Sequence, residues 1–436
     1  MATIESILRD PVKLPFRKAQ IKRRQASDGL YEANWFDITS LVEKWGTLQT
    51  SVDALRLNQF IHSGIKLTVR NDYGEFNSEN DGGSLFFDFF TRYRTKVRIQ
   101  AGYTDGAGNQ FPTDPTQGIF ILDGVIKSNI KNNTAILNCK SIFSPFQEER
   151  ADNIGGITSS ITSFEIMEKI RDMTDGSGNV IFRQFISSTS WSIQSTTANI
   201  TRLGTTTALS GFSVWELMNK LAEFEGFMIH ATRTGGIKFA NRLPNTSTSK
   251  LSFFGAGFRR PNIIRLNSIE ETVDKLFTHI RFKYLDEDTE TSFIAAGTQT
   301  TVGIDSLEWK YGRRTYEFEN QFVSDSQTAE FIVNNIKTEF SNLRSELKMD
   351  CVFTPQLEIL DPVDVSYREG SINSIQLWDF RTWAANTITS DTTTTLTWAS
   401  ETSSTIDFNK KNFKILSRKT NLDNFTTSFQ LREIEN

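Results

Sequence analysis

Apolar and polar residues alternate along most of this chain, and a period of two residues predicts strands rather than helices. Strand-like runs before residue 142 are GIKLTVRND, TKVRIQAGY, GIFILDGVI and TAILNCKSI. Similar runs after residue 265 are LFTHIRFKYL, RRTYEFENQF, ELKMDCVFT, PVDVSYREG and NFKILSRKT. Turns that contain Gly, Asn and Asp separate them at roughly the spacing of a barrel or sandwich. The sequence therefore predicts a mainly β protein, α+β overall.

Three stretches have instead the apolar spacing of an amphipathic helix. Two of them begin at capping boxes. In a capping box, the side chain before the helix accepts from the backbone amide of the third helical residue, and the side chain of that third residue accepts from the backbone amide of the capping residue. These pairs are Thr162 with Glu165 and Ser213 with Glu216. The helix after Ser213 ends at Gly226, and residues 227–242 follow as a hairpin with a tight turn at Thr234-Gly235-Gly236. The third helix is predicted near 326–342.

The chain has 436 residues, which is too many for one hydrophobic core, since cores stop growing near ~250 to 300 residues. Residues 118–142 and 412–434 share a pattern of strand, polar turn and strand, and a matched strand precedes each. This favours an internal duplication; chance similarity between short strands is the alternative. The predicted parts are an N-terminal arm at 1–27, a first β-barrel domain at 28–145, a smaller α+β insertion domain at 146–265, and a second, related β-barrel domain at 266–436 that contains the helix near 326–342 and an excursion at 371–411.

The N-terminal arm is richer in basic than in acidic residues, which predicts a solvated or subunit-clasping segment. A formal charge of -4 is small for the chain, so it favours neither a nucleic-acid protein nor a disordered acidic chain, and it indicates protein partners. The 35 Phe residues predict a Phe-packed β core, with some of these side chains in subunit interfaces as the sharper hypothesis.

Cys139 and Cys351 are too isolated for a disulfide framework or a metal site, which fits assembly in a reducing compartment. The first twenty residues lack the apolar core of a secretory signal, and no run of 18 apolar residues occurs, so we expect no membrane span.

We predict no catalytic, cofactor-binding or metal-binding residues. The chain has no HExxH, GxSxG, P-loop or zinc spacing. His62, His230 and His279 are scattered, and the last two read as structural residues of strands. Four further signals do not support a functional site. TDGAGN (104–109) and TDGSGN (174–179) lack calcium ligands and read as turns, GAGFRR (255–260) is a weak dinucleotide signal, and Asp286, Glu287, Asp288 and Glu290 read as a solvated hairpin tip rather than a glycosidase carboxylate pair.

Taken together, the chain resembles the tail hub (baseplate hub or tail tip hub) proteins of tailed bacteriophages and contractile injection systems. The resemblance is carried by GIFILDGVIKSNIKNNTAILNCKSI, by SVWELMNKLAEFEGFMIHATRTGGIKFANR, by TAEFIVNNIKTEFSNL with ELKMDCVFTPQLEILDPVDVSY, and by FKILSRKTNLDNFTTSFQLREI. It spans about residues 20 to 434 through loose motifs. It implies a homotrimer whose two barrel domains form a pseudo-sixfold ring.

The resemblance also implies partners and a place. The ring is expected to join the tail tube and the distal tail protein on one side to a tail tip, needle or fibre on the other. It would surround a channel for the tape measure protein and for DNA in transit. The protein would be a structural, non-enzymatic virion component, assembled in the host cytoplasm and located in the tail tip or baseplate. Two alternatives stay open: a hexameric distal tail ring protein, and a carbohydrate-binding or carbohydrate-cleaving tail protein, for which exposed aromatics beside two carboxylates in a cleft would be diagnostic.

Overall fold

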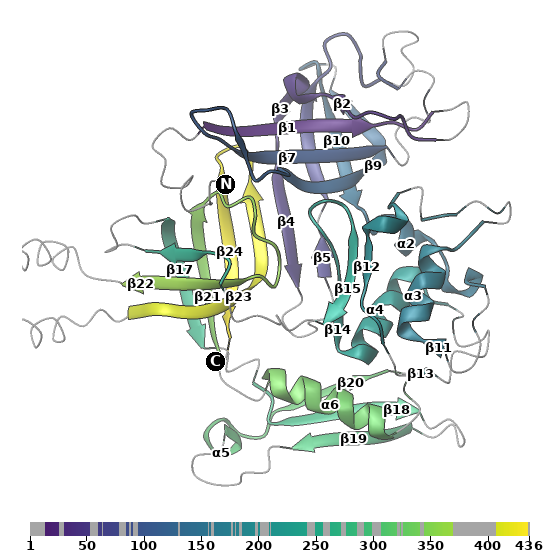
Figure 1. Ribbon diagram of the computed structural model, residues 1–436, viewed down its shortest axis with the longest axis vertical. Coiled ribbons are helices and arrows are strands. Elements are labelled where there is room, and N and C mark those ends of the chain that lie inside the picture. The colour runs from purple at the N-terminus through teal and green to yellow at the C-terminus, as the bar shows by residue number, and fades with distance from the viewer. Residues whose placement is uncertain are drawn as a thin grey trace, which may run out of the picture.

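Two large β-sheets dominate the computed structural model, with helices and smaller sheets packed around them (Figure 1). The mainly β fold with two curled sheets agrees with the fold class predicted from the sequence. The structure describes residues 14–25, 30–52, 60–62, 64–77, 84–86, 89, 95–129, 131–155, 157, 161–175, 178, 180–182, 185–196, 199–200, 209, 211–241, 249–255, 262–271, 276–285, 292–298, 307–320, 323, 326–340, 344–368 and 407–434.

The first sheet has the order β2-β1-β7-β9-β10-β6-β3, with β8 on β7. Its strands are β1 (Leu14–Lys22), β2 (Phe36–Asp37), β3 (Val42–Lys44), β6 (Ile65–Arg70), β7 (Lys96–Thr104), β8 (Gln110–Phe111), β9 (Thr116–Asn129) and β10 (Thr134–Ser141). Alternate residues of these strands point into one core, where Leu67, Val97 and Leu137 are fully buried. A short 3₁₀ turn, η1 (Thr39–Leu41), leads into β3.

The expected arm at 1–27 differs from the structure over its second part. Leu14–Lys22 is strand β1, and it pairs antiparallel with β7 from Leu14 opposite Thr104 to Lys22 opposite Lys96. Ala19 and Ile21 are fully buried on its inner face. The apolar residues that interrupt the basic run are therefore the buried positions of a strand, while residues 1–13 lie outside the described part of the chain.

The second sheet has the order β16-β22-β23-β24-β21-β17. Its strands are β16 (Ser252–Phe254), β17 (Ile263–Glu271), β21 (Ser345–Val352), β22 (Pro362–Arg368), β23 (Asp407–Asn421) and β24 (Thr426–Glu433). A hairpin of β4 (Thr47–Val52) and β5 (Phe60–His62) joins it through β23. Two predicted boundaries therefore differ from the sheets, since β4 and β5 fall inside 28–145 and β16 and part of β17 fall before residue 266. Most of the predicted excursion at 371–411 lies outside the described residues; its last part, 407–411, is the start of β23.

The middle of the chain folds as a helical unit with a small sheet. It contains α2 (Ser144–Glu148), α3 (Ser163–Arg171), α4 (Val214–Glu225), β11 (Ile161–Thr162), β12 (Trp191–Ile193), β13 (Asn199–Ile200), β14 (Phe227–Ala231), β15 (Ile237–Asn241) and the 3₁₀ turns η2 (Ala151–Asn153) and η3 (Ser188–Ser190). Both predicted capping boxes are present, and Gly226 ends α4 with a left-handed φ of 66°. The predicted hairpin is formed by β14 and β15.

The described parts of residues 276–340 form a further small unit, where the second barrel was predicted to contain two strand-like runs and one helix. It has the sheet β19-β18-β20, with β18 (His279–Leu285), β19 (Ser292–Thr298) and β20 (Thr315–Glu319), together with α5 (Leu307–Tyr311) and α6 (Ser326–Phe340). Ala329, Ile332 and Val333 of α6 are buried, so the predicted helix is amphipathic and covers this sheet. Figure 1 shows the small unit at the end of the molecule away from the first sheet.

The two large sheets share one strand order, as the internal sequence similarity predicts. In chain order, β3, β6, β7, β9 and β10 correspond to β17, β21, β22, β23 and β24. In space these strands run β7-β9-β10-β6-β3 and β22-β23-β24-β21-β17, and every neighbouring pair is antiparallel. The sixth position differs, because β1 is antiparallel to β7 whereas β16 is parallel to β22.

Register is shared as well. Val69 of β6 lies between Val42 and Ala135, and Cys351 of β21 lies between Ile263 and Thr427. The hairpin turns also match: Asn129 pairs with Thr134 and Asn421 with Thr426, and the left-handed residues before the second strands are Asn133 (φ 50°) and Phe425 (φ 53°). Agreement of order, register and turn supports a duplication.

Matching the two similar sequence runs from their first residues predicts that strand 118–126 corresponds to 412–420, and the ladders correct this alignment slightly. The ladders place 118–122 on 411–415 and 126–129 on 418–421. The difference arises because β9 carries one more bulged residue after Leu122 than β23 carries after Ile415.

No helix among the described residues is both long enough and apolar enough to cross a membrane.

Candidate functional site: the junction between the two sheets

A buried arginine joins the two sheets. Arg418 projects from β23, and only 7% of it is exposed. Its Nη1 donates to the carbonyl of Leu357 at 2.8 Å, and its Nη2 donates to Oε1 of Gln117 on β9 at 2.6 Å. Burial lowers the pKa of Arg418 to about 10; the charge of Arg233 acts in the same direction, while Glu358 and Asp361 oppose it. The guanidinium therefore remains charged at neutral pH.

Gln117 completes this contact through its amide nitrogen. Nε2 lies 3.1 Å from the carbonyl oxygen of Ala101, 3.2 Å from that of Pro115 and 3.0 Å from that of Pro355. The first two carbonyls belong to the first half of the chain and the third to the connection between β21 and β22. The amide thus accepts from one half and donates to both, a role that a charged or purely accepting side chain does not fill.

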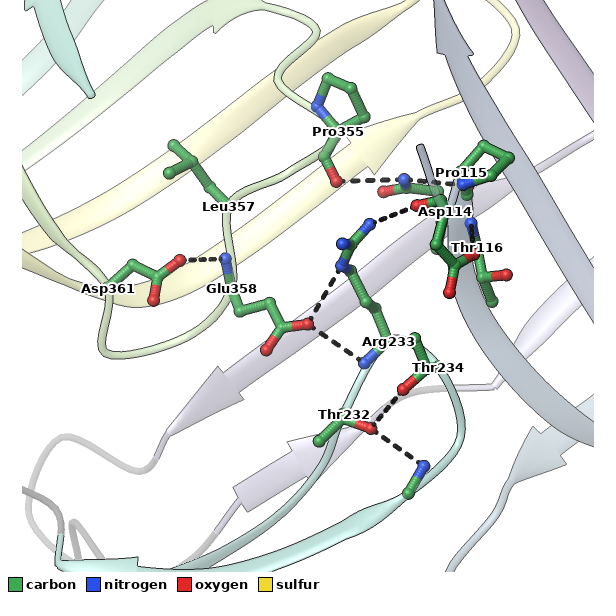
Figure 2. A network of polar contacts seen from close by, with 12 residues as sticks. Asp114, Pro115, Thr116, Thr232, Arg233, Thr234, Pro355, Leu357, Glu358 and Asp361 are labelled. Atoms are coloured by element: carbon green, nitrogen blue, oxygen red, sulfur yellow. Dashed lines mark hydrogen bonds and ion pairs between the residues drawn. The ribbon is translucent and has the colours of Figure 1, made fainter. Parts of the chain in front are cut away.

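The hairpin of the helical unit meets the same place. Figure 2 shows Arg233, at the turn between β14 and β15, lying between Asp114 and Glu358. Its Nη1 donates to the carbonyl of Asp114 at 2.7 Å, and its Nε lies 3.3 Å from Oε1 of Glu358. The turn itself is held by Thr232, whose Oγ1 accepts from the amide of Gly236 at 2.9 Å. Hairpin, first sheet and second sheet are therefore joined by one polar network.

Carboxylates close the network on its outer side. The amide of Glu358 donates to Oδ2 of Asp361 at 2.8 Å, and Lys250 lies 2.5 Å from Oδ1 of Asp361. Burial by itself raises the pKa of Asp114, but hydrogen bonds from Thr116 and the charges of Arg233 and Arg98 lower it overall. The carboxylates at this junction serve as acceptors and counter-charges.

A second set of contacts fixes the same two halves further along. Tyr103 donates its hydroxyl to the carbonyl of Phe353 at 2.9 Å, and the two rings lie 5.8 Å apart. Arg17 donates to the carbonyl of Leu422 at 2.6 Å. Phe353 and Leu422 are fully buried in the core of the first sheet, although they belong to the second half of the chain. This shared core makes the two sheets one structural body.

Residues weighed in the sequence for chemistry lie apart from this junction. TDGAGN is the predicted turn, between β7 and β8, where Oδ1 of Asp105 accepts from the amide of Asn109 at 2.7 Å. TDGSGN is described only in part, with a bridge from Thr174 to Val180. Of GAGFRR only Gly255 is described, and Asp286, Glu287, Asp288 and Glu290 lie outside the described residues. The strands around this acidic run, β18 and β19, form the predicted hairpin.

The histidines and cysteines are also separate from each other. His230 is buried in β14 opposite Lys238, His279 begins β18, and His62 ends β5. Cys139 and Cys351 are free buried thiols, and burial raises the pKa of each. Within the described residues, no three His, Cys, Asp or Glu side chains gather as a metal site would require.

The sequence pattern did not predict a role for Gln117, Arg233, Glu358 or Arg418. The available signal was an arginine within the apolar run of β23, since a charged residue at a buried strand position requires a partner. Its partner Gln117 lies 301 positions away, so the pattern of the sequence does not identify it.

Comparison with known proteins adds an architectural likeness. No family model matches the sequence, and no curated protein matches it. The structure is similar to the tail protein from Neisseria meningitidis MC58, with a TM-score of 0.51, 9% identity and coverage of 96% of both chains. Two further similar structures are the 43 kDa tail protein of prophage MuSo2 from Shewanella oneidensis and the prophage tail protein gp18 from Listeria monocytogenes EGD-e. The Shewanella protein has a TM-score of 0.48 and 11% identity, and the match covers 95% of this chain and 96% of that chain. The Listeria protein has a TM-score of 0.46 and 13% identity, and the match covers 96% of this chain and 95% of that chain.

The fold assignment rests on the Neisseria protein. At 9% identity the likeness concerns the fold, and it extends over nearly the whole length of both chains. The chain therefore has the fold of a tail protein, in agreement with the resemblance found in its sequence.

Proposed function

We propose that this protein is a structural component of a phage-type tail, the hub at the tail tip or baseplate. The observation that carries the proposal is the pair of sheets with one strand order, joined through a buried network and a shared core. Two similar sheets per chain let three chains present six similar surfaces, which is what a threefold hub beneath a sixfold tube requires. The tail-protein fold supports this function, and the virion is the proposed location.

The proposed partners are those that the resemblance to tail hub proteins implies. A homotrimer would contact the tail tube and the distal tail protein on its pseudo-sixfold side, and tail tip or fibre proteins on its threefold side. Its ring would surround the channel for the tape measure protein and for DNA in transit. The small unit and the helical unit would then lie outside the inner ring, since each is inserted between or beside the sheets.

Oligomeric state tests this proposal directly. Native mass spectrometry of the full chain, alone and with its tail partners, is expected to give a trimer of about 3 × 49.6 ≈ 149 kDa. A stable monomer at micromolar concentration in the presence of tail partners would contradict the hub assignment. A hexamer would instead favour the distal tail ring alternative.

We also infer that the hub is not an enzyme. Within the described residues, the Arg418 and Arg233 side chains are held by carbonyl, amide and carboxylate oxygens. No three His, Cys, Asp or Glu side chains gather there as a catalytic or metal centre would require. The full chain is expected to release no sugar or peptide from peptidoglycan or polysaccharide above a buffer control. Turnover that disappears in Asp286→Asn or Asp288→Asn would revive the carbohydrate-cleaving alternative.

A further inference from the structure

The duplicated sheets differ in how one strand edge is covered. In the second sheet, the segment Arg418–Asn421 of β23 pairs with β24 on one side and with β4 on the other. Thr420 in this segment is only 1% exposed. A strand on each side therefore completes this end of β23.

In the first sheet, residues 126–129 of β9 are the counterpart of this segment. They pair with β10 on one side, whereas β7 pairs with β9 only as far as Ile121. Across the ranges that the structure describes, no ladder covers the other side of 126–129. Lys127, Ser128 and Asn129 are exposed, and Oγ of Ser128 donates to Oδ1 of Asn77 at 2.8 Å, which is a side-chain contact and not a ladder. Thr420, the counterpart of Ser128, is instead buried. Among the described residues this strand edge is open, and an open edge is a template for another strand.

The position of β4 in the chain indicates which segment would lie against the open edge of β9. β4 and β5 are inserted between β3 and β6, the first two strands of the shared order. In the second half, the chain between the corresponding strands, β17 and β21, is the small unit of residues 276–340. The small unit is thus the topological counterpart of the hairpin that completes β23.

Within one chain the small unit does not lie near the edge of β9. Figure 1 places β18, β19, β20 and α6 at one end of the molecule and the first sheet at the other. The small unit also exposes large side chains, with Trp309 70% and Phe331 55% accessible. Exposed aromatic residues of this kind are enriched where proteins associate.

We propose that the edge of β9 at residues 126–129 is covered by the small unit of a second copy of this chain. The contact is head to tail, so it can repeat around a ring. In the proposed trimer this ring closes after three copies. It reproduces between chains the cover that β4 provides within a chain. The inference rests on the proposed trimer and names the surfaces through which its copies meet.

Photo-crosslinking from two equivalent lysines tests this contact. Lys127 of β9 corresponds to Lys419 of β23, and both side chains are exposed. Each is replaced in turn by p-benzoylphenylalanine in the full chain, and equal amounts of light and ¹⁵N-labelled protein are assembled, irradiated and digested for mass spectrometry. From position 127 we expect mixed light–heavy cross-links to peptides of residues 276–340. From position 419, which pairs with Gln49, we expect unmixed cross-links to residues 47–52.

Amide hydrogen exchange provides a second readout on the unmodified protein. Exchange at residues 127–129 is expected to slow at least tenfold on assembly, while exchange at 419–421 stays nearly constant because β4 already covers it. A trimer whose position 127 cross-links elsewhere, or whose 127–129 amides keep their exchange rate, overturns the proposed contact and leaves the hub function standing. A chain that stays monomeric with its tail partners overturns both.

Discussion

Single polar side chains decide how firmly the two halves of this molecule are joined. Gln117 is 6% exposed, and it supplies the acceptor for one arm of the buried Arg418 guanidinium. The other arm is held by the carbonyl of Leu357. Because a buried cation loses the hydration that it has in the unfolded chain, each of these acceptors is needed.

Replacing Gln117 by Ala removes an acceptor from a buried charge and a donor from three carbonyls. We expect Gln117→Ala to lower the free energy of unfolding by about 2 to 3 kcal/mol, measured by urea denaturation. Gln110→Ala, at an exposed position of β8, is the matched control, and its effect should stay within about 0.5 kcal/mol. Equal stability of the two variants would show that the Gln117 to Arg418 bond adds nothing to the junction.

The buried His230 predicts a particular dependence on pH. Burial, together with the charge of Lys238 on the paired strand, lowers the pKa of His230 from 6.5 to about 4. The unfolded chain therefore binds the proton more tightly than the folded chain. This contribution to stability is fully present above about pH 6.5 and is lost as the pH falls towards 4, at a total of about 3 kcal/mol.

Two variants separate the contribution of His230 from that of the carboxylates, which titrate in a similar pH range. The difference in unfolding free energy between the wild type and His230→Gln should shrink between pH 6.5 and pH 5, measured by urea titration at each pH. Lys238→Gln removes the neighbouring charge, so the pKa of His230 should rise and the acid sensitivity should decrease. A constant difference across this range would contradict the argument.

At the scale of elements, the helix α4 shows how strongly a local signal fixes a boundary. The amide of Glu216 donates to Oγ of Ser213 at 3.2 Å, and the amide of Ser213 donates back to Oε2 of Glu216 at 2.8 Å. Ser213→Ala is expected to cost about 1 kcal/mol, and Ser213→Asp should cost much less, since aspartate caps equally well. Thermal unfolding followed by circular dichroism measures both. Equal melting temperatures of the two variants would show that the capping side chain does not contribute to stability.

Local signals explain which elements the sequence predicted well. The capped helices, the hairpin after Gly226 and the alternating strands each depend on residues within a few positions of one another. The strand β1 and the hairpin β4–β5 were placed less well, because their sheet membership depends on partners far along the chain, such as Thr104 for Leu14 and Ser417 for Ser51. The junction of Gln117 with Arg418 is long-range in the same sense, so periodicity carries no information about it.

For the whole molecule, the internal duplication is the feature that connects sequence to assembly. The two sheets agree in strand order and register but differ at their additions: a β4–β5 hairpin in the first half and the small unit in the second. Because the two halves of each chain differ, a ring of three chains would have only threefold symmetry. Because their sheets agree in strand order and register, such a ring could still offer six similar surfaces to a sixfold partner. The fixed junction keeps the two sheets of one chain in constant relation. In the proposed trimer, contacts within a chain would therefore alternate with contacts between chains.

This alternation leads to the last prediction, which concerns symmetry in an assembled tail. Electron cryo-microscopy of the tail tip, reconstructed without imposed symmetry, is expected to show six similar β-sheet lobes around the channel that belong to three copies of this chain. Two kinds of lobe should alternate around the channel. In one, β4 of the same chain pairs with β23; in the other, a neighbouring chain lies against the edge of β9. Labelling the chain at one site should therefore mark three positions, one on every second lobe. Six labelled positions would mean six copies in true sixfold symmetry, and the duplicated sheets would then not serve as an adaptor between three and six.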